Sequence, residues 1–152
     1  MTIRVDSAAR EDRQKVGISV AIATYNGKRH LPELLASIEA QTKPPIEIIC
    51  SDDASTDGTP DFLEKYAERS TIPIHVLRQK HNVGIIENFL TAFQGTRGTF
   101  IAYCDQDDVW LPEKLSCFHA ALSPSVHLVC QPSIITDATL QAIETTAPPP
   151  TA

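Results

Sequence analysis

Three aspartates, Asp105, Asp107 and Asp108, stand within four residues and directly follow an apolar run. Carboxylates this close repel one another unless a cation lies between them. Their oxygens are ligands that Mg²⁺ and Mn²⁺ prefer, and these ions also bind phosphate oxygens while keeping several waters. The cluster therefore predicts a divalent-cation site, although a solvated turn with helix-capping aspartates would give the same pattern.

A second acidic pair, Asp52 and Asp53, also follows an apolar run. A carboxylate there can accept a hydrogen bond from a nucleobase N–H or a ribose hydroxyl. The alternative is that Asp53, Ser55 and Asp57 build a turn and cap the next helix, because short polar side chains bond nearby main-chain amides. Both interpretations can hold at once, and we expect Asp57 to be mostly structural and Asp53 mostly functional.

Asn82 and Gly84 precede a predicted helix. Asn82 can adopt a left-handed turn, and Gly84 lets the main chain approach a ligand closely. An ordinary strand-to-helix turn explains the two residues equally well. The five histidines show no metal-ligand spacing, and the G-x-S-x-G and Walker A sequences of hydrolases and P-loop proteins are missing.

The elements that must position these residues alternate regularly. Strand-length apolar runs cover residues 18–24, 46–50, 74–77, 99–104 and 126–130. Between them, apolar residues recur with helical spacing. The helical sets are Leu31, Leu34, Leu35 and Ile38; Leu63, Tyr66 and Ala67; Ile86, Phe89, Leu90 and Phe93; and Leu111, Leu115, Phe118 and Leu122. This alternation predicts an α/β domain with a mostly parallel sheet, whose ligands bind beyond the carboxyl ends of the strands.

The same pattern sets the expected boundaries. Residues 1–16 are polar and indicate a flexible leader, residues 17–135 form the predicted domain, and residues 136–152 form an irregular tail. The prolines near the end cannot continue a helix or a central strand. Within the domain, we expect Thr59 to cap a helix with Pro60 in its first turn, and Pro112 to play a similar part before Glu113.

Composition narrows the class of protein. The chain has 152 residues, of which 42% are hydrophobic, a size and composition typical of one globular domain. Its formal net charge of -6 argues against a nucleic-acid binder. Cys50, Cys104 and Cys130 fall in predicted strands, which suits a reducing compartment. With no apolar leader and no membrane-length apolar run, the sequence predicts a cytoplasmic protein without a transmembrane segment, peripheral membrane association being the other location that it allows.

The motifs together resemble family 2 glycosyltransferases of the GT-A fold. The segments VAIATYNG, ICSDDASTDGT, NVGIIENF and YCDQDDVWLPEKL match in order over residues 16–115, and weakly to residue 135. NVGIIENF and DQDDVWLPEKL are most similar to the rhamnosyltransferase and surface-polysaccharide subgroup. The resemblance implies a Rossmann-like, mostly parallel sheet with flanking helices, here truncated. It also implies an inverting, metal-dependent transfer of a sugar from a nucleotide-diphosphate donor to a glycan or lipid-linked acceptor.

By this resemblance, the first two loops would hold the nucleoside of a UDP- or dTDP-linked sugar. Thr24 and Tyr25 would line the base pocket, with Asn26 beside them in the donor site. Asp53 would bind the uracil or thymine base.

The later loops would hold the rest of the donor. Asn82 and Gly84 would border the base and the ribose. The segment Asp105-Gln106-Asp107 matches the D-x-D motif of the family. Asp107 would ligate the Mg²⁺ or Mn²⁺ that bridges the diphosphate, and Asp105 would contact the ribose or the water shell of the metal. The neighbouring Asp108 would support that loop.

The resemblance also implies a general base that this sequence does not offer. The family places an acidic residue, often in a Glu-Asp pair, well beyond the D-x-D motif. After Glu113 the sequence has only Asp137 and Glu144. We therefore expect an incomplete chain without a catalytic base of its own. The alternatives are a non-catalytic nucleotide-binding module that works with a partner chain, and a metal-dependent nucleotidyltransferase, which would need a Gly-rich basic loop near the first strand.

Overall fold

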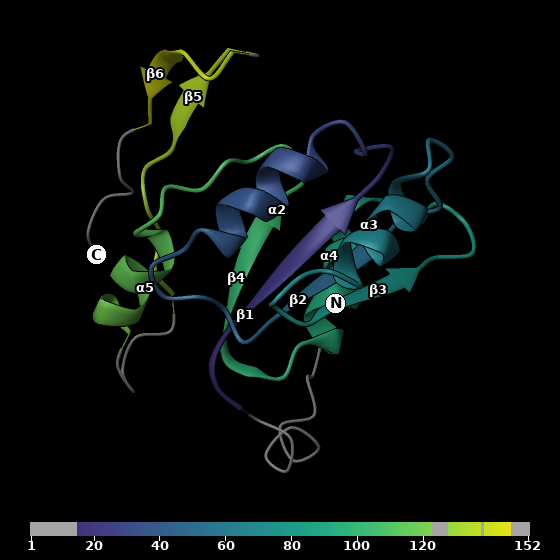
Figure 1. Ribbon diagram of the computed structural model, residues 1–152, viewed down its shortest axis with the longest axis horizontal. Helices are drawn as coiled ribbons and strands as arrows, with labels where there is room; N and C mark the ends of the chain where they lie inside the picture. The colour runs from purple at the N-terminus through teal and green to yellow at the C-terminus, as the bar shows by residue number, and fades with distance from the viewer. Residues whose placement is uncertain (1–14, 123–127, 138, 147–152) are drawn as a thin grey trace. The chain divides into compact units, whose positions relative to one another are not determined.

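The computed structural model describes residues 15–122, 128–137 and 139–146. The chain divides into two compact units, one ending at Ser116 and the other beginning at Cys117. In the first unit, strands alternate with helices as the sequence predicts (Figure 1). These elements are β1 (Lys15–Thr24), α2 (Leu31–Glu39), β2 (Glu47–Asp52), α3 (Thr59–Ala67), β3 (Ile74–Arg78), α4 (Ile85–Gly95) and β4 (Gly98–Asp105). A further helix, α5 (Lys114–Ala121), runs across the division.

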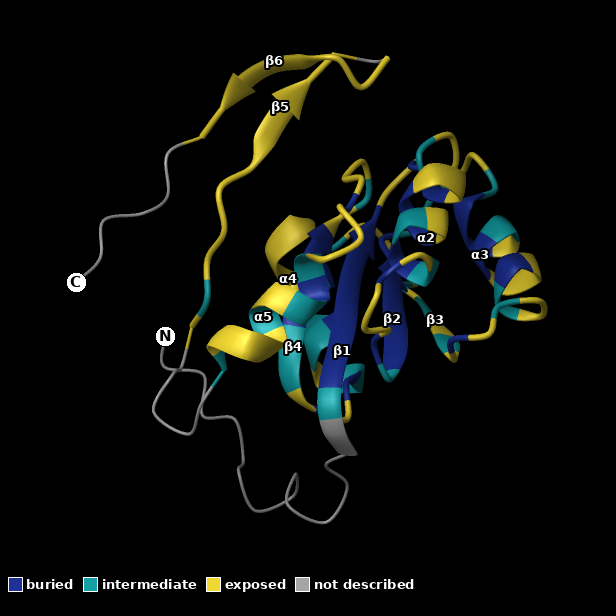
Figure 2. Ribbon diagram, turned by 60° about the vertical axis from the view of Figure 1, so that its left-hand side comes forward, coloured by how far each residue is buried: buried dark blue, intermediate teal, exposed yellow. Residues whose placement is uncertain are grey.

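The four strands form one parallel sheet in the order β3-β2-β1-β4. Ala23 of β1 pairs with Ser51 of β2 on one side and with Asp105 of β4 on the other. The carboxyl ends of these three strands are therefore level at one edge of the sheet. Right-handed crossovers in this strand order put α2 and α3 on one face and α4 on the other, as Figure 2 shows.

The apolar runs become the centre of the sheet. All six residues of β2 are buried, as are residues 18–24 of β1. Against them lies the predicted face of α2, whose Leu31, Leu34, Leu35 and Ile38 have no exposed surface. Burying one such side chain contributes about 1.5–3 kcal/mol. The central strands are thus firmly held, and so are the loops that start at their ends.

The predicted face of α4 is only partly correct, because Phe89, Leu90 and Phe93 are half-buried and none of the four predicted residues is fully buried. Asn88 and Ala92 are its buried residues, whereas Ile86 is 72% exposed. Ala92 packs against Ala21 and Ile49 of the sheet. The small side chains of Ala92 and Ala21 suit a close approach of α4 to β1 at this point, so steric fit contributes to which positions are fully buried.

The predicted helix starts need correction at two places. Gly58, with φ of 84°, occupies the capping position of α3, and Thr59 is the first residue of the helix. Asp57 takes the capping role instead, because its carboxylate accepts a hydrogen bond from the Thr59 N–H (2.9 Å). Pro60 lies in the first turn as predicted. Helix α5 begins at Lys114, later than the proline start expected at Pro112.

The second unit contains an antiparallel hairpin of β5 (Ile134–Thr136) and β6 (Ala142–Thr145). Its strand residues are all exposed. We predict an irregular tail over residues 136–152, and the structure instead has this hairpin over much of the described part. Asp137 stabilises its turn by accepting hydrogen bonds from the N–H groups of Thr139 (2.8 Å) and Gln141 (3.0 Å).

The strand predicted at residues 126–130 is not formed at residues 128–130, and Leu128 is 79% exposed. No second layer covers this apolar stretch in the described part of its unit, so burial does not select a strand there. Residues 126 and 127 lie outside the described residues. Cys130, expected in that strand, is exposed.

Two other expectations concern the start of the chain and membrane spans. Strand β1 already begins at Lys15, inside the predicted leader, and residues 1–14 lie outside the described residues. Across the described residues, every helix is too short or too polar to span a bilayer.

Candidate functional site

A cavity of about 400 Å³ opens at the carboxyl edge of the sheet. It lies beside β1, where the strand order reverses between β2 and β4, which is where open α/β sheets bind ligands. The loops that follow all four strands take part in this region. The lining residues are Ala23, Thr24, Tyr25, Asp53, Asn82, Gly84, Ile85, Asn88, Asp105, Gln106 and Asp107. Every predicted site residue except Asn26 is among them.

The loop after β1 turns sharply at Asn26, whose φ is 49°. The Asn26 N–H donates to Ser55 Oγ (2.8 Å), and Asn26 Oδ1 accepts from the Thr56 N–H (2.9 Å). Asn26 therefore ties this loop to the β2–α3 loop and does not face the cavity. Asn82 has no such left-handed conformation, so the turn that we predict there occurs at Asn26. Tyr25, which is 49% exposed, also lines the cavity.

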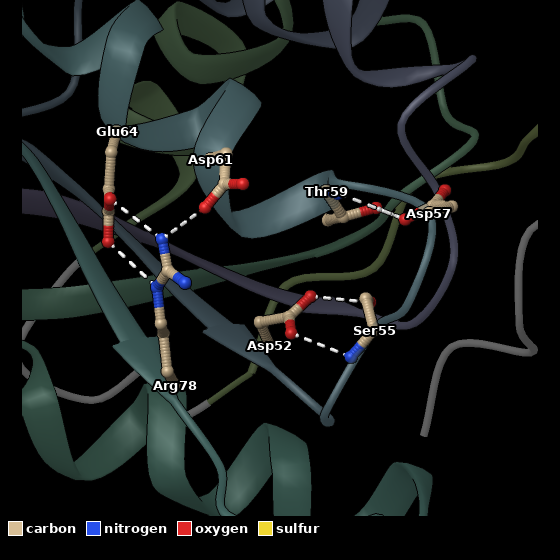
Figure 3. Close-up of polar contacts among 7 residues, drawn as sticks. All are labelled: Asp52, Ser55, Asp57, Thr59, Asp61, Glu64 and Arg78. Carbon is tan, nitrogen blue, oxygen red and sulfur yellow. Dashed lines mark hydrogen bonds and ion pairs between the residues drawn. The ribbon is translucent and has the colours of Figure 1, made fainter.

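The β2–α3 loop is held by its own aspartates (Figure 3). Asp52 accepts hydrogen bonds from the Ser55 N–H (2.9 Å) and hydroxyl (2.6 Å). Asp57 accepts from the N–H and hydroxyl of Thr59 and from the Lys28 N–H. Slight desolvation of the exposed Asp57 opposes its ionisation, but these hydrogen bonds outweigh it and lower its pKa. Asp57 thus has the structural role that the sequence suggests.

Asp53 lines the cavity and also holds the next loop. Its buried carboxylate accepts hydrogen bonds from the main-chain N–H groups of Val83 (2.6 Å) and Gly84 (2.9 Å). Each carboxylate oxygen keeps further acceptor capacity, because an ionised carboxylate has about four lone-pair positions. Gly84 has a φ of 87°, with open space where a Cβ would lie. Glycine is therefore needed there for conformation and not for room.

The end of β4 brings Asp105 and Asp107 to the cavity, with Asp108 one residue further. Partial burial, and then the negative charges of Asp108 and Asp107, raise the pKa of Asp105. A cation at this edge would offset that repulsion. Among the described residues, no three His, Cys, Asp or Glu side chains gather into a group that could hold a metal ion. Asp105 and Asp107 alone would leave most of the coordination shell of a divalent ion to phosphate oxygens and water.

Two polar residues that line the cavity, Gln106 and Asn88, are not predicted from the sequence. Gln106 Oε1 accepts from the Tyr25 N–H (2.9 Å), and its Nε2 donates to the Tyr25 carbonyl (3.2 Å). Asn88 is buried, its Nδ2 donates to the Thr24 carbonyl (3.2 Å), and its Oδ1 has no partner in the described structure. Gln106 is the variable position of the D-x-D pattern, and Asn88 interrupts an apolar helix. The sequence signal for Asn88 is that a polar residue buried in an otherwise apolar helix needs a hydrogen-bond partner.

The acidic residues that follow Glu113 are Asp137 and Glu144, both in the hairpin unit. Asp137 is engaged in the hairpin turn, and its hydrogen bond with the Thr139 hydroxyl is the largest cause of its lowered pKa. Glu144 lies on β6. In the described part of the first unit, the carboxylates at the cavity are Asp53, Asp105 and Asp107. Asp53 is already engaged by two main-chain amides.

The chain is similar to known proteins over most of its length. The sequence profile of glycosyl transferase family 2 matches residues 19–139. Abequosyltransferase RfbV of Salmonella typhimurium is 36% identical over 107 residues, which cover 69% of this chain and 32% of RfbV.

Solved structures extend the likeness to the fold. TarS of S. aureus in complex with UDP-GlcNAc aligns with a TM-score of 0.62 and 32% identity, covering 68% of this chain and 30% of that one. The mannosyltransferase PcManGT of Pyrobaculum calidifontis, in complex with GDP-Man and Mn²⁺, aligns with a TM-score of 0.67 and 25% identity, covering 74% and 34%. The chain thus spans about a third of the length of each of these proteins.

Proposed function

Because the chain belongs to glycosyl transferase family 2 and has its α/β, GT-A fold, we propose that its cavity binds a nucleotide-diphosphate sugar. The sugar is then transferred, with inversion, to a glycan or lipid-linked acceptor in surface-polysaccharide synthesis. One observation carries this proposal: the polar residues after β1, β2, β3 and β4 converge on a single cavity at the reversal of strand order. The rhamnosyltransferase-like subgroup and the cytoplasmic, membrane-peripheral location stay predictions from the sequence.

The nucleoside would lie against the loops after β1, β2 and β3. The half-exposed Tyr25 ring offers a surface on which a base can stack. Asp53 has acceptor capacity left for a base N–H while it holds the amides of Val83 and Gly84. Asn82, which is exposed at the cavity rim, has a carboxamide for the base or ribose. The complex of TarS with UDP-GlcNAc supports a uracil donor.

The diphosphate would lie at the end of β4. Asp107 and Asp105 would hold Mg²⁺ or Mn²⁺ there, and the bound ion would neutralise charge on the departing diphosphate. The raised pKa of Asp105 and the Mn²⁺ in the PcManGT complex support this assignment. The part played by the chain is to fix the two carboxylates through the turn in which the Asp108 N–H donates to the Asp105 carbonyl (3.3 Å).

A second candidate is a nucleotide-binding module that works with a partner chain. The observation that favours it is the shortage of free acidic groups: no cavity carboxylate of the described first unit is placed apart from the donor as a base for an acceptor hydroxyl. Both candidates predict donor binding, and they differ only in sugar transfer.

Calorimetry tests the binding site directly. We expect UDP to bind in the presence of Mn²⁺ and to lose most of its affinity when the ion is chelated. Asp107→Ala should abolish the metal-dependent part of binding, because it removes a proposed ligand. Glu113→Ala is the matched control, since it removes an exposed carboxylate that does not line the cavity. Equal affinity with and without the chelator would reject the metal role, and no binding under any condition would reject the donor site.

A further inference from the structure

We infer that Gln106 is a positioning residue that joins two loops of the cavity, the loop after β4 and the loop after β1. Ordering of the loop at the diphosphate end then also orders the loop at the base end. This inference rests on the proposed function, because it assigns the two ends of one donor to the two loops. The residue lies between Asp105 and Asp107, the proposed metal ligands, yet its side chain is directed at Tyr25, a residue of another strand end.

The contact between Gln106 and Tyr25 is two-pointed. The carboxamide oxygen accepts from the Tyr25 N–H (2.9 Å), and the carboxamide nitrogen donates to the Tyr25 carbonyl (3.2 Å). Among side chains of this length, only a carboxamide supplies a donor and an acceptor side by side. Both main-chain groups of Tyr25 are thereby fixed just beyond the last paired residue of β1. The contact thus continues the β1–β4 pairing with a side chain in place of a strand.

Gly27 provides the space for this contact. A Cβ built on Gly27 would overlap the Gln106 carboxamide, to which all three of its nearest atoms belong. The φ of Gly27 is not in the left-handed region, so its backbone would accept an alanine. An alanine there would therefore displace the flexible end of Gln106 rather than strain the loop. Replacing either Gly27 or Gln106 should therefore break the same contact with Tyr25.

The consequence is a coupling between the two halves of the site. A cation held by Asp105 and Asp107 restricts the loop that carries Gln106. Through the two hydrogen bonds, it also restricts Tyr25, which lines the cavity. A ligand that binds an already ordered loop loses less conformational entropy and binds more tightly. Gln106 therefore makes the base site stronger when the metal site is filled, even for a ligand with no phosphate to bridge them.

The experiment measures the affinity of uridine, which has no phosphate, with and without saturating Mn²⁺. In the unmodified chain we expect Mn²⁺ to tighten uridine binding about fivefold or more, the lower end of common coupling strengths. Gln106→Met keeps the length of the side chain and removes both hydrogen bonds, and its ratio should fall to about one. Gly27→Ala should give the same loss, and the double variant no further loss, because both changes break the same contact.

A second readout needs no ligand. Hydrogen exchange of the Tyr25 amide should speed up about tenfold in either variant, while the amides of residues 19–23 keep their protection. A variant that fails to fold would lose protection across β1, and the other variant then carries the test. UDP binding with an unchanged uridine ratio in Gln106→Met and Gly27→Ala would overturn this inference alone. Absence of UDP binding in the unmodified chain would overturn the proposed function and this inference with it.

Discussion

At the scale of single residues, the acidic residues after β2 show how one residue type serves different ends. Asp52 and Asp57 satisfy hydrogen-bond donors of their own loop, whereas Asp53 crosses to the loop after β3. From the sequence alone, Asp57 is assigned a structural role because a predicted helix follows it, whereas Asp53 is assigned a functional one. The sequence cannot show that Asp53 is needed to shape the cavity as well as to face it.

Replacing Asp53 should therefore cost stability as well as affinity. Asp53→Ala leaves the partly buried N–H groups of Val83 and Gly84 without their acceptor, and the two losses together should cost about 1–3 kcal/mol. Urea denaturation should show a lower free energy of unfolding by about that amount. Asp61→Ala is the control, because its exposed ion pair with Arg78 contributes about 0–1 kcal/mol. Equal losses in both variants would contradict the bridging role of Asp53.

The four cysteines make a second residue-scale prediction. Burial, followed by the charge of Asp52, raises the pKa of Cys50 to about 12, and burial also raises that of Cys104. Both thiols therefore stay protonated and unreactive at pH 8. Cys117 and Cys130 are exposed. We expect a disulfide reagent to label the two exposed thiols quickly and the two buried ones only after denaturation. Rapid labelling of all four in the folded chain would contradict this burial.

The residues of the cavity show how much of the site can be predicted from the sequence. Position after an apolar run was enough to bring Thr24, Asp53 and Asp105 to one cavity, because parallel strands align their carboxyl ends. Asn26 does not line the cavity, since its side chain accepts a hydrogen bond from the loop after β2. Gln106 could not be found by type or spacing, because its partner is the main chain of Tyr25, whose position depends on the register of β1 against β4.

At the scale of elements, continuous apolar runs identified β1 to β4, and helical spacing identified the helices between them. The fully buried positions of α4 differ from the prediction because its apolar residues form one stripe, and burial is complete only at the edge of that stripe, at Ala92 and the neighbouring Asn88. The hairpin of β5 and β6 was missed for a different reason. Its strands are exposed, so no alternation of buried and exposed positions marks them in the sequence.

The packing of α4 can be tested on the helix itself. Ala92→Leu adds volume where Ala92 meets Ala21 and Ile49, and overpacking of this kind costs about 1–3 kcal/mol. Ile86→Ala on the exposed side should change the free energy of unfolding by about 0.5 kcal/mol or less. Thermal or urea denaturation of both variants measures the difference. A larger loss for Ile86→Ala than for Ala92→Leu would return the helix to the orientation predicted from the sequence.

At the scale of the whole molecule, we expect this chain to bind a nucleotide-sugar donor and to transfer no sugar by itself. General-base catalysis supplies about 100- to 10,000-fold, and the cavity of the first unit shows no carboxylate free for that role in the described residues. The measurement is radiolabelled UDP-sugar with soluble and lipid-linked acceptors. Binding of UDP-GlcNAc by TarS serves as the control for donor quality. Acceptor-dependent transfer by the 152 residues would reveal a base that this cavity does not show.

The register of β1 has a further consequence for how the molecule comes into being. Ile22 of β1 pairs with Cys50 of β2 on one side and with Cys104 of β4 on the other. The pairing of β1 is therefore incomplete until β4, which is synthesised much later, is available. Contacts between such distant segments form slowly, because a long loop must close first. The Asp105 and Asp107 wall of the cavity arrives with that last partner. A nascent chain on the ribosome therefore has no complete cavity until β4 has emerged and docked, so ligand binding reports that β4 is in place.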